Sequence, residues 1–529
     1  MKNIKYILLT SILIGFTACN EDEYDYTPDP EPLPALTAGE ADFTKYVAVG
    51  ASFTAGYTDN ALFINAQENS FPNTIAKEFA KIGGGNFVQP LMNDNIGGLL
   101  LGGQQDSRFA PRLYFYSDQD PNDDFDSGPY PLGIVPHLND FIGEIPTTEA
   151  FNNIGSNFNN FGIPGAKSYH LTAPGFAAAN PYYTRIASGL TASVLSDAMA
   201  QNPTFFTLSE VGGNDVLGYA TSGGDGSDPI TPIGTFDFAL NTLVSGLTAN
   251  NAKGVIGNLP NITSLSHFTT VPHNPLSPTN PDFAPQIPLL NATFAPLNQA
   301  FAFLGMPERA IVFSETEASP VVIHDESLPN IQPQLNAVLI GGGLDAATAG
   351  VLSAQFAQSR QATADDLLVL PSSSVIATVN VAYYTQLVTA GVPAATAGQL
   401  SVNGVTFPLE DKWVLLPQEQ DEIAMATQAY NASISAAASA NGLALVDLNA
   451  ILEEASSTGI VFDDYTLNTD LVFGGLVSLD GVHLTARGYA LMANSFLKAI
   501  DATYGSNFEA SGNLAKAGDF PTNYSPTLQ

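Results

Sequence analysis

The sequence has little positive charge, a single cysteine and no apolar run long enough for a membrane-spanning helix. Its 529 residues include 16 lysines and arginines against 51 acidic residues, for a net charge of −35. A surface this acidic repels phosphate groups, which excludes nucleic acid as a partner and argues against electrostatic docking onto anionic lipid headgroups. Neutral or cationic ligands should approach more easily than anionic ones. One cysteine excludes an intramolecular disulfide.

Apolar residues, in contrast, are abundant. Hydrophobic residues make up 45% of the chain and aromatic residues 10%, which is enough for a large buried core and excludes global disorder. By length the chain could hold about two to four domains or one elaborated α/β domain. The pattern described below favours a single domain over residues 43–529.

The first residues carry a secretion pattern. Two lysines precede an apolar run at 6–16 that is too short to span a bilayer comfortably and ends in Thr17-Ala18-Cys19. This ending resembles the processing box of bacterial lipoproteins, although Phe16 stands where leucine is usual. The resemblance implies a signal peptide at 1–18 and lipid attachment at Cys19. An ordinary signal peptide followed by a chance cysteine is the alternative.

The segment after the cysteine looks like a tether. An acidic run at 20–25 is followed by alternating prolines between 28 and 34, a composition that cannot bury enough apolar surface to fold. We therefore expect residues 19–42 to link a lipid anchor to the folded domain. The acidic run is similar to the export signal of lipoproteins on the outer face of the outer membrane. It is equally consistent with a plain solvated linker.

Strand and helix patterns alternate along the rest of the chain. The apolar patterns predict strands at 45–50, 204–208, 253–259 and 443–447, and helices at 71–82, 236–247, 419–440 and 485–500. This alternation predicts an α/β fold, with helices on both faces of a parallel sheet. Ligands of such sheets bind beyond the carboxyl ends of the strands, so chemistry is expected in the loops that follow strands.

Two long stretches interrupt the alternation. Residues 92–156 are rich in Gly, Pro, Asn and Asp, and residues 263–408 are apolar and low in charge. The second stretch contains a near repeat at 343–353 and 391–401, but stacked repeats need about three or more copies. We expect a partly helical insertion with a duplicated turn. It could act as a lid over an apolar substrate or simply cover one flank of the core.

Four short segments fall just after predicted strands or at loop positions. They span residues 49–56, 160–166, 210–215 and 479–485. Taken singly, each of the first three is typical of a turn. In the fourth, Asp480 stands three residues before His483, so its carboxylate can reach the imidazole Nδ1. A lone pair with this spacing is more often structural than catalytic.

Taken together, the four segments resemble the SGNH, or GDSL, hydrolases, whose conserved blocks contribute Ser, Gly, Asn and His in this chain order. Ser52, Gly165, Asn214 and His483 match these positions, and Asp480 stands in the Asp-x-x-His position. The blocks span nearly the whole folded chain. The resemblance implies a three-layer α/β/α, flavodoxin-like fold. It also implies an esterase or lipase that cleaves carboxylic esters.

The implied roles follow from acyl-transfer chemistry. Ser52 would be the nucleophile, His483 its general base, and Asp480 the group that orients the imidazole and stabilises its charged form. The backbone N–H groups of Ser52 and Gly165 and the side-chain amide of Asn214 would form the oxyanion hole. This chemistry needs no metal or organic cofactor. We expect a monomer whose one contact with the membrane is the N-terminal lipid.

The resemblance leaves two matters open. Ala51 and Phe53 replace the Asp and Leu of the common Gly-Asp-Ser-Leu block, which puts the subfamily in doubt more than the chemistry. The acyl group could be long, as in a lipase, or an acetyl group on a glycan. The rival from another class is a surface-exposed binding lipoprotein that keeps this fold without turnover. The intact triad and Asn214 argue against it.

Two weaker candidates involve metal ions. The acidic stretch 118–126 superficially resembles a calcium loop, but Asp123 stands where an EF-hand needs glycine and Pro129 where it needs glutamate. We favour a solvated acidic loop. His267 and His273 lack accompanying cysteines or carboxylates, so we expect loop histidines with satisfied hydrogen bonds rather than metal ligands.

Overall fold

Five parallel strands form the central sheet of the structure, a computed structural model that describes residues 32–117, 127–132 and 145–528. The strands are β1 (Tyr46–Gly50), β6 (Asn160–Gly162), β7 (Phe205–Leu208), β8 (Lys253–Gly257) and β13 (Ala444–Val446). They lie in the order β13-β8-β7-β1-β6. Counted along the chain, this order is 2-1-3-4-5, the order of flavodoxin-like doubly wound sheets. The predicted α/β fold with a parallel sheet is confirmed.

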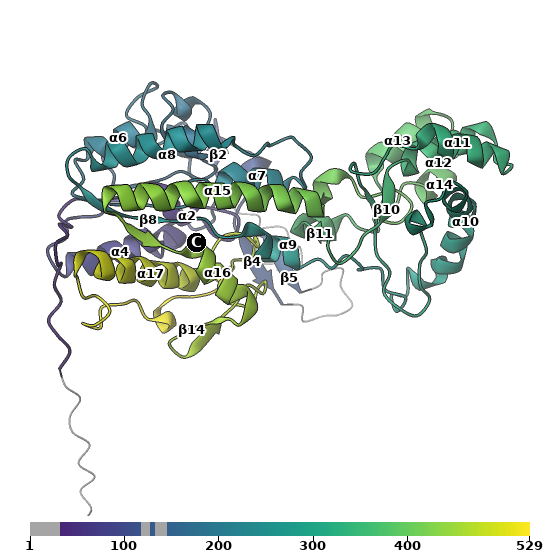
Figure 1. The fold of residues 1–529 in the computed structure, drawn as a ribbon. Helices are drawn as coiled ribbons and strands as arrows, with labels where there is room; N and C mark the ends of the chain where they lie inside the picture. Colours follow the sequence, from purple (N-terminus) through teal and green to yellow (C-terminus); the bar gives the residue numbers. More distant parts are fainter. Residues whose placement is uncertain (1–31, 118–126, 133–144, 529) are drawn as a thin grey trace, which may run out of the picture. The chain divides into compact units, whose positions relative to one another are not determined.

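Helices cover both faces of this sheet (Figure 1). One face carries α4 (Phe71–Ala80) and α17 (Ala486–Tyr504), and the other carries α6 (Val194–Ala200), α8 (Ile233–Thr248) and α15 (Pro417–Asn441). Because both faces are covered, β1 and β7 are buried along their whole length, as continuous apolar runs predict. Helix α17 begins where the Thr485 hydroxyl accepts the Gly488 N–H, and α15 ends at Gly442 in the left-handed conformation.

The predicted elements are present, with ends shifted by a few residues. The elements that were not predicted include two that bear on the site: β6, which is only three residues long, and α7 (Gly213–Thr221). The sequence had suggested a loop at Asn214. In the structure Asn214 lies in the first turn of a helix. The folded unit also begins earlier than predicted, at Leu36. In the segment read as tether, the Thr37 N–H already donates to Asn507.

The first insertion consists of short hairpins in its described part. They are formed by β2 (Leu100–Leu101), β3 (Gln104–Gln105), β4 (Leu113–Tyr116) and β5 (Gly128–Pro131). Arg112 is fully buried and donates to the carbonyl groups of Asn95 and Ser525, which fastens this region to the end of the chain. The possible calcium loop at 118–126, the signal peptide and Cys19 lie outside the described residues.

The second insertion builds a hydrophobic core of its own. Its helices are α10 (Ile287–Phe303), α11 (Gln332–Gly341), α12 (Ala346–Phe356), α13 (Val381–Thr389) and α14 (Ala394–Gln399). Its core extends to Leu416, beyond the predicted boundary at residue 408. The near repeat corresponds to two turns, α11–α12 and α13–α14, that pass through Gly343 and Gly391 at φ of 99° and 92°. The duplicated turn is confirmed.

The strand order reverses between β1 and β7, and doubly wound sheets bind ligands at this point. The loops that follow β1, β6 and β7 therefore meet at one edge of the sheet, and they carry the first three sequence blocks. None of the helices in the described part of the chain is both long and apolar enough to cross a membrane.

Candidate active site

The first and third blocks meet at the carboxyl edge of the sheet. Ser52 begins the short helix α2 (Ser52–Ala55) after β1, and Asn214 lies in α7 after β7. Both residues line one pocket, together with Val482 of the fourth block. Only 8% of the Ser52 surface is exposed. The structure therefore brings the predicted nucleophile and one predicted oxyanion donor to a common cavity.

The fourth block approaches the first through aromatic rings. The His483 ring centroid lies 5.6 Å from that of Phe53 and 4.6 Å from that of Tyr57. Among the described residues, no hydrogen bond joins the Ser52 hydroxyl to the His483 ring. Hydrogen bonds between catalytic groups are often long without substrate and tighten in the complex. His483 therefore lies close to the turn that carries Ser52, but the two side chains are not hydrogen-bonded in this structure.

Glu210 holds the turn that carries Ser52. Its Oε1 accepts the backbone N–H groups of Ala51 and Thr54 at 2.6 and 2.9 Å, and its Oε2 accepts the Thr54 hydroxyl at 3.2 Å. Burial raises the pKa of Glu210 and these three hydrogen bonds lower it. The effect of burial is larger, so the pKa lies above its ordinary value. This role was not predicted from the sequence, although Glu210 opens the third block. Its position directly after a predicted strand was the available signal.

Asp215 connects the third block to the second in a similar way. It is fully buried, and its two carboxylate oxygens accept the backbone N–H and the hydroxyl of Ser168 at 2.7 and 2.6 Å. Ser168 stands three residues after Gly165. The loop that carries Gly165 is therefore fixed by a residue adjacent to Asn214. Each carboxylate of this block positions a loop that begins at another strand.

The sequence predicted three N–H donors for an oxyanion, from the backbones of Ser52 and Gly165 and the side chain of Asn214. Ser52 is the first residue of α2, where a backbone N–H has no acceptor within the helix. Gly165 has a φ of 76°, and no atom lies within 4 Å of the position that a Cβ would occupy. The Asn214 amide donates to the Ala166 carbonyl at 2.9 Å, which fixes its orientation and leaves a second N–H to donate.

Asp480 and His483 form a direct pair. Asp480 Oδ2 lies 2.9 Å from His483 Nδ1, as the three-residue spacing predicted. An ionised carboxylate can only accept, so the proton lies on Nδ1 and Nε2 is left free to accept a proton. The backbone N–H of His483 also donates to Asp480 Oδ1 at 2.8 Å, which fixes the pair as a rigid unit.

The Asp480 carboxylate accepts five hydrogen bonds. Besides the two from His483, it accepts the N–H groups of Val482 at 2.9 Å and Asn60 at 2.8 Å, and the Ser478 hydroxyl at 3.0 Å. Burial raises the pKa of Asp480, but the charge of His483 and these hydrogen bonds outweigh it, so the pKa lies well below its ordinary value. Asp480 therefore stays ionised at neutral pH.

An apolar pocket of about 100 Å³ extends from Ser52. Its wall is largely apolar and includes Leu259 after β8, Leu448 and Leu452 from α16 (Leu448–Ser457), and Met492 from α17. Of the described residues of the second insertion, only Leu265, at its very start, lines this pocket. The alternative that the insertion forms the pocket wall is therefore not supported by the structure.

His267 differs from the satisfied loop histidine that the sequence suggested. It lies in α9 (Ser266–Thr269), is 8% exposed, and its ring interacts with the backbone and the charge of Asp480. Burial lowers its pKa, which favours the neutral ring. Its backbone N–H donates to the Gly481 carbonyl at 2.9 Å, so the residue supports the turn between Asp480 and His483.

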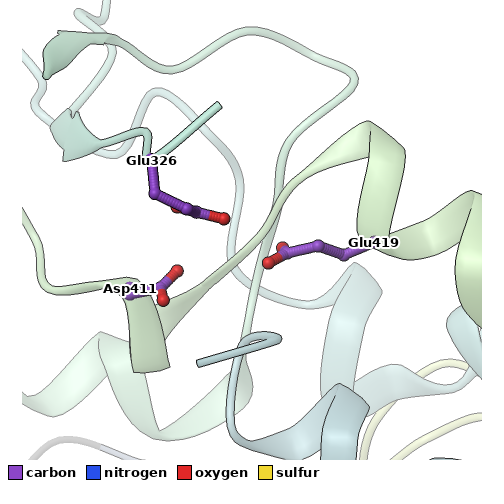
Figure 2. A group of neighbouring side chains, drawn as sticks. All are labelled: Glu326, Asp411 and Glu419. Atoms are coloured by element: carbon purple, nitrogen blue, oxygen red, sulfur yellow. The ribbon is translucent and has the colours of Figure 1, made fainter. Parts of the chain in front are cut away.

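A second group of carboxylates lies in and beside the insertion. Oxygen atoms of Glu326, Asp411 and Glu419 lie within 4.8 Å of one another, and Figure 2 shows the three side chains pointing toward a common centre. Burial and neighbouring carboxylates raise the pKa of Asp411 to about 7 and that of Glu419 to about 9. Among the described residues, this group has the ligand atoms and spacing to hold a hard cation. The sequence analysis did not identify it, because its members are 85 and 8 residues apart along the chain.

Comparison with known proteins identifies no relative. The chain matches no family model, no curated protein and no solved structure. The assignment of function therefore rests on the residues and on their arrangement.

Proposed function

We propose that the protein is a serine ester hydrolase of the SGNH kind. The observation that carries the proposal is the Asp480–His483 pair beside the sheet edge that also holds Ser52 and Asn214. A carboxylate stabilised by five donors and bonded to Nδ1 keeps the imidazole in the tautomer that a general base requires. A structural aspartate-histidine pair needs neither the adjacent pocket nor the free N–H groups around it.

The mechanism has two halves. The Ser52 hydroxyl attacks the ester carbonyl while His483 Nε2 accepts its proton, and the oxyanion receives the N–H groups of Ser52, Gly165 and Asn214. His483 then protonates the leaving alcohol, which leaves an acyl group on Ser52. In the second half a water molecule, deprotonated by the same nitrogen, attacks the acyl group and frees Ser52. Asp480 stabilises the imidazolium in both halves.

The apolar pocket supports a substrate with an apolar acyl group. It begins at Ser52, where the acyl carbon of the intermediate would be attached, and it is lined almost entirely by hydrocarbon side chains. Each buried CH₂ of an acyl chain contributes up to about 0.8 kcal/mol. An acetyl group would leave this pocket empty, so the pocket favours the longer acyl esters over an acetylated glycan.

The rival function is binding without turnover. It is favoured by the missing hydrogen bond between Ser52 and His483. A fluorophosphonate probe distinguishes the two functions, because it reacts only with an activated serine. We expect it to label Ser52 in the intact chain, with the adduct located by peptide mapping and abolished in Ser52→Ala. A folded protein that resists the probe would be a binding protein.

We also propose that Cys19 anchors the enzyme in the outer membrane through lipid. The lipoprotein-like sequence at 16–19 supports this proposal. Cys19→Ser should release soluble protein and abolish incorporation of labelled palmitate, while esterase activity persists. Protease treatment of intact cells tests the side of the membrane: digestion places the protein on the surface, and resistance until the outer membrane is lysed places it inside.

A further inference from the structure

A tight turn after α2 lies directly against the fourth block. Asp59 and Asn60 both adopt the left-handed conformation, with φ of 50° and 62°, and a bridge between Thr58 and Ala61 closes the turn. Consecutive left-handed residues other than glycine cost free energy, so the surrounding structure must hold them in place. Among the contacts that hold them are hydrogen bonds with residues 478–480.

These contacts involve both oxygens of the Asp480 carboxylate. The Asn60 N–H donates to Oδ2 at 2.8 Å. The Ser478 hydroxyl accepts the Asp59 N–H at 3.1 Å and donates to Oδ1 of Asp480 at 3.0 Å. The Asp59 carboxylate in turn accepts the Leu479 N–H at 3.1 Å. The turn and Ser478 therefore contact both oxygens of the aspartate, including Oδ2, which also contacts His483 Nδ1.

Asp59 is itself a buried acid that the mechanism above does not use. It is 1% exposed, and within the described residues its Oδ2 has no hydrogen-bond partner. Burial raises its pKa to about 7; the Leu479 N–H lowers it, the Asp480 charge raises it and the Arg112 guanidinium lowers it. Tyr524 also interacts with this carboxyl group. Asp59 therefore changes its charge in the pH range where an imidazole does.

We propose that Asp59 is a positioning residue that holds Asp480 in place through Ser478 and Leu479, and that its ionisation places a second negative charge behind the Asp480–His483 pair. The role of Asp59 in turnover rests on the proposed function, but its coupling to the His483 ring does not. Asp59 does not touch the substrate. It acts on the base through the carboxylate that orients it.

An ionised Asp59 favours the charged imidazole, and a charged imidazole favours ionised Asp59, so the two groups should titrate together. The His483 ring should then show two overlapping steps and not one. Removing the Asp59 charge should leave a single step at lower pH.

Histidine NMR tests this without any need for activity. The chain has six histidines, and ¹³C-labelled rings can be followed from pH 5 to 9, with His483 assigned from His483→Gln. Asp59→Asn removes the charge and keeps an oxygen to accept the Leu479 N–H. We expect the midpoint of the His483 ring titration to fall by about 0.5 to 1 pH unit. The control is Asp197→Asn, a buried carboxylate whose partners are Tyr183 and Ser188.

A second measurement follows the aspartate carboxyl groups directly. With ¹³C-labelled aspartate, the carboxyl groups of Asp59 and Asp411 should both titrate near neutral pH, and the signal that is lost in Asp59→Asn should share both steps with His483. The proposal is overturned if the signal lost in Asp59→Asn does not titrate there, or if Asp59→Asn and Asp197→Asn leave the same midpoint. If coupling is seen but no variant or intact protein reacts with fluorophosphonate, the proposed function fails and the coupling stands. Where the enzyme is active, kcat should follow the shifted titration while KM stays unchanged.

Discussion

The carboxylates of Asp480 at the sheet edge and Glu419 beside the insertion differ in the direction in which their pKa values shift. At the sheet edge, Asp480 accepts five hydrogen bonds and its pKa is lowered. At the insertion, Glu326, Asp411 and Glu419 face one another, and the pKa of Glu419 rises to about 9 (Figure 2). Burial raises the pKa in both regions. The number of donors and the sign of the neighbouring charge decide the outcome.

Inside the insertion, a single cation, Arg360, helps to lower the pKa of a buried carboxylate, that of Asp366. Arg360 donates to Asp325 at 2.6 Å and binds both oxygens of Asp366 at 2.6 and 2.7 Å. Burial raises the pKa of Asp366, but the guanidinium and the Thr363 N–H lower it further, so it lies below its ordinary value. Asp325 and Glu326 are adjacent in sequence, yet only Asp325 has this partner. Asp366 and Asp480 therefore keep their charge because cations and hydrogen-bond donors surround them, whereas Glu419 faces other carboxylates.

The largest expected effect comes from removing the charge of Asp480. Asp480→Asn keeps the shape of the side chain, but its amide can donate to the ring and stabilise the wrong tautomer of His483. We expect kcat to fall by about 10⁴-fold, as for the orienting aspartate of other serine hydrolases, with little change in KM. Ester hydrolysis under saturating substrate measures this. A loss of less than tenfold in folded protein would show that Asp480 is structural.

The next effect concerns stability. Arg360→Met leaves Asp325 and Asp366 buried without a cation, and we expect the free energy of unfolding to fall by about 3–5 kcal/mol at pH 7. Urea unfolding measures it. The control is Arg108→Met, which breaks an exposed pair with Asp106 and should change stability little. The loss at Arg360 should shrink at pH 4, where both carboxyl groups can take up protons; an equal loss at both pH values would contradict the electrostatic account.

Removing the charge of Glu419, one of the three carboxylates that face one another, should raise stability instead of lowering it. The pKa of Glu419 in the folded chain, about 9, lies above its ordinary value, so the folded state holds a proton that the unfolded state releases. Stability is therefore complete below about pH 4.5 and is lost as pH rises toward 9. Glu419→Gln keeps the acceptor for the Leu416 N–H and removes this loss.

We expect Glu419→Gln to gain roughly 1–2 kcal/mol at pH 8 and nothing at pH 4. Thermal unfolding across this range measures the gain, and Glu453→Gln, exposed on α16, is the control. The experiment is run in EDTA and again with calcium. A variant that is less stable than the intact chain only in calcium would mean that the three carboxylates bind a cation.

Much of the fold was accessible from the sequence because its strands are buried on both faces. Runs such as 45–50 and 204–208 are apolar throughout, and the helices beside them repeat apolar residues at helical spacing. Strand β6 was missed because three residues carry no periodicity, and its pairing with β1 is a long-range contact. The extent of the insertion core, to Leu416, was also underestimated, because a boundary is set by packing rather than by composition.

The site was predicted in part, for a similar reason. The Asp480–His483 bond is local, so the three-residue spacing was sufficient to predict it. Glu210 and Asn60 act on residues 159 and 420 positions away, respectively, and no local pattern reports such contacts. The carboxylate cluster was invisible for the same reason. Spacing along the chain predicts pairs within a turn. The hydrogen-bond donors that determine the pKa of a carboxylate come from residues that only the tertiary fold brings together.

The last prediction concerns where the acyl chain lies. The pocket beside Ser52 is in the sheet region, while the insertion has a separate apolar groove lined by Val338 and Leu344. If the chain occupies the pocket, kcat/KM should rise from acetyl to octanoyl esters by up to about fourfold per CH₂. Leu448→Trp fills the pocket and should stop this rise, with acetyl ester hydrolysis unchanged.

Leu344→Trp is the matched change in the insertion, made at another half-buried leucine, and it should leave the chain-length dependence intact. A series of p-nitrophenyl esters measured for the three proteins distinguishes the regions. If Leu344→Trp flattens the series and Leu448→Trp does not, the insertion holds the acyl chain after all. If the intact enzyme prefers acetyl esters and neither substitution matters, the apolar pocket is simply core, and a short-acyl substrate such as an acetylated glycan becomes the better assignment.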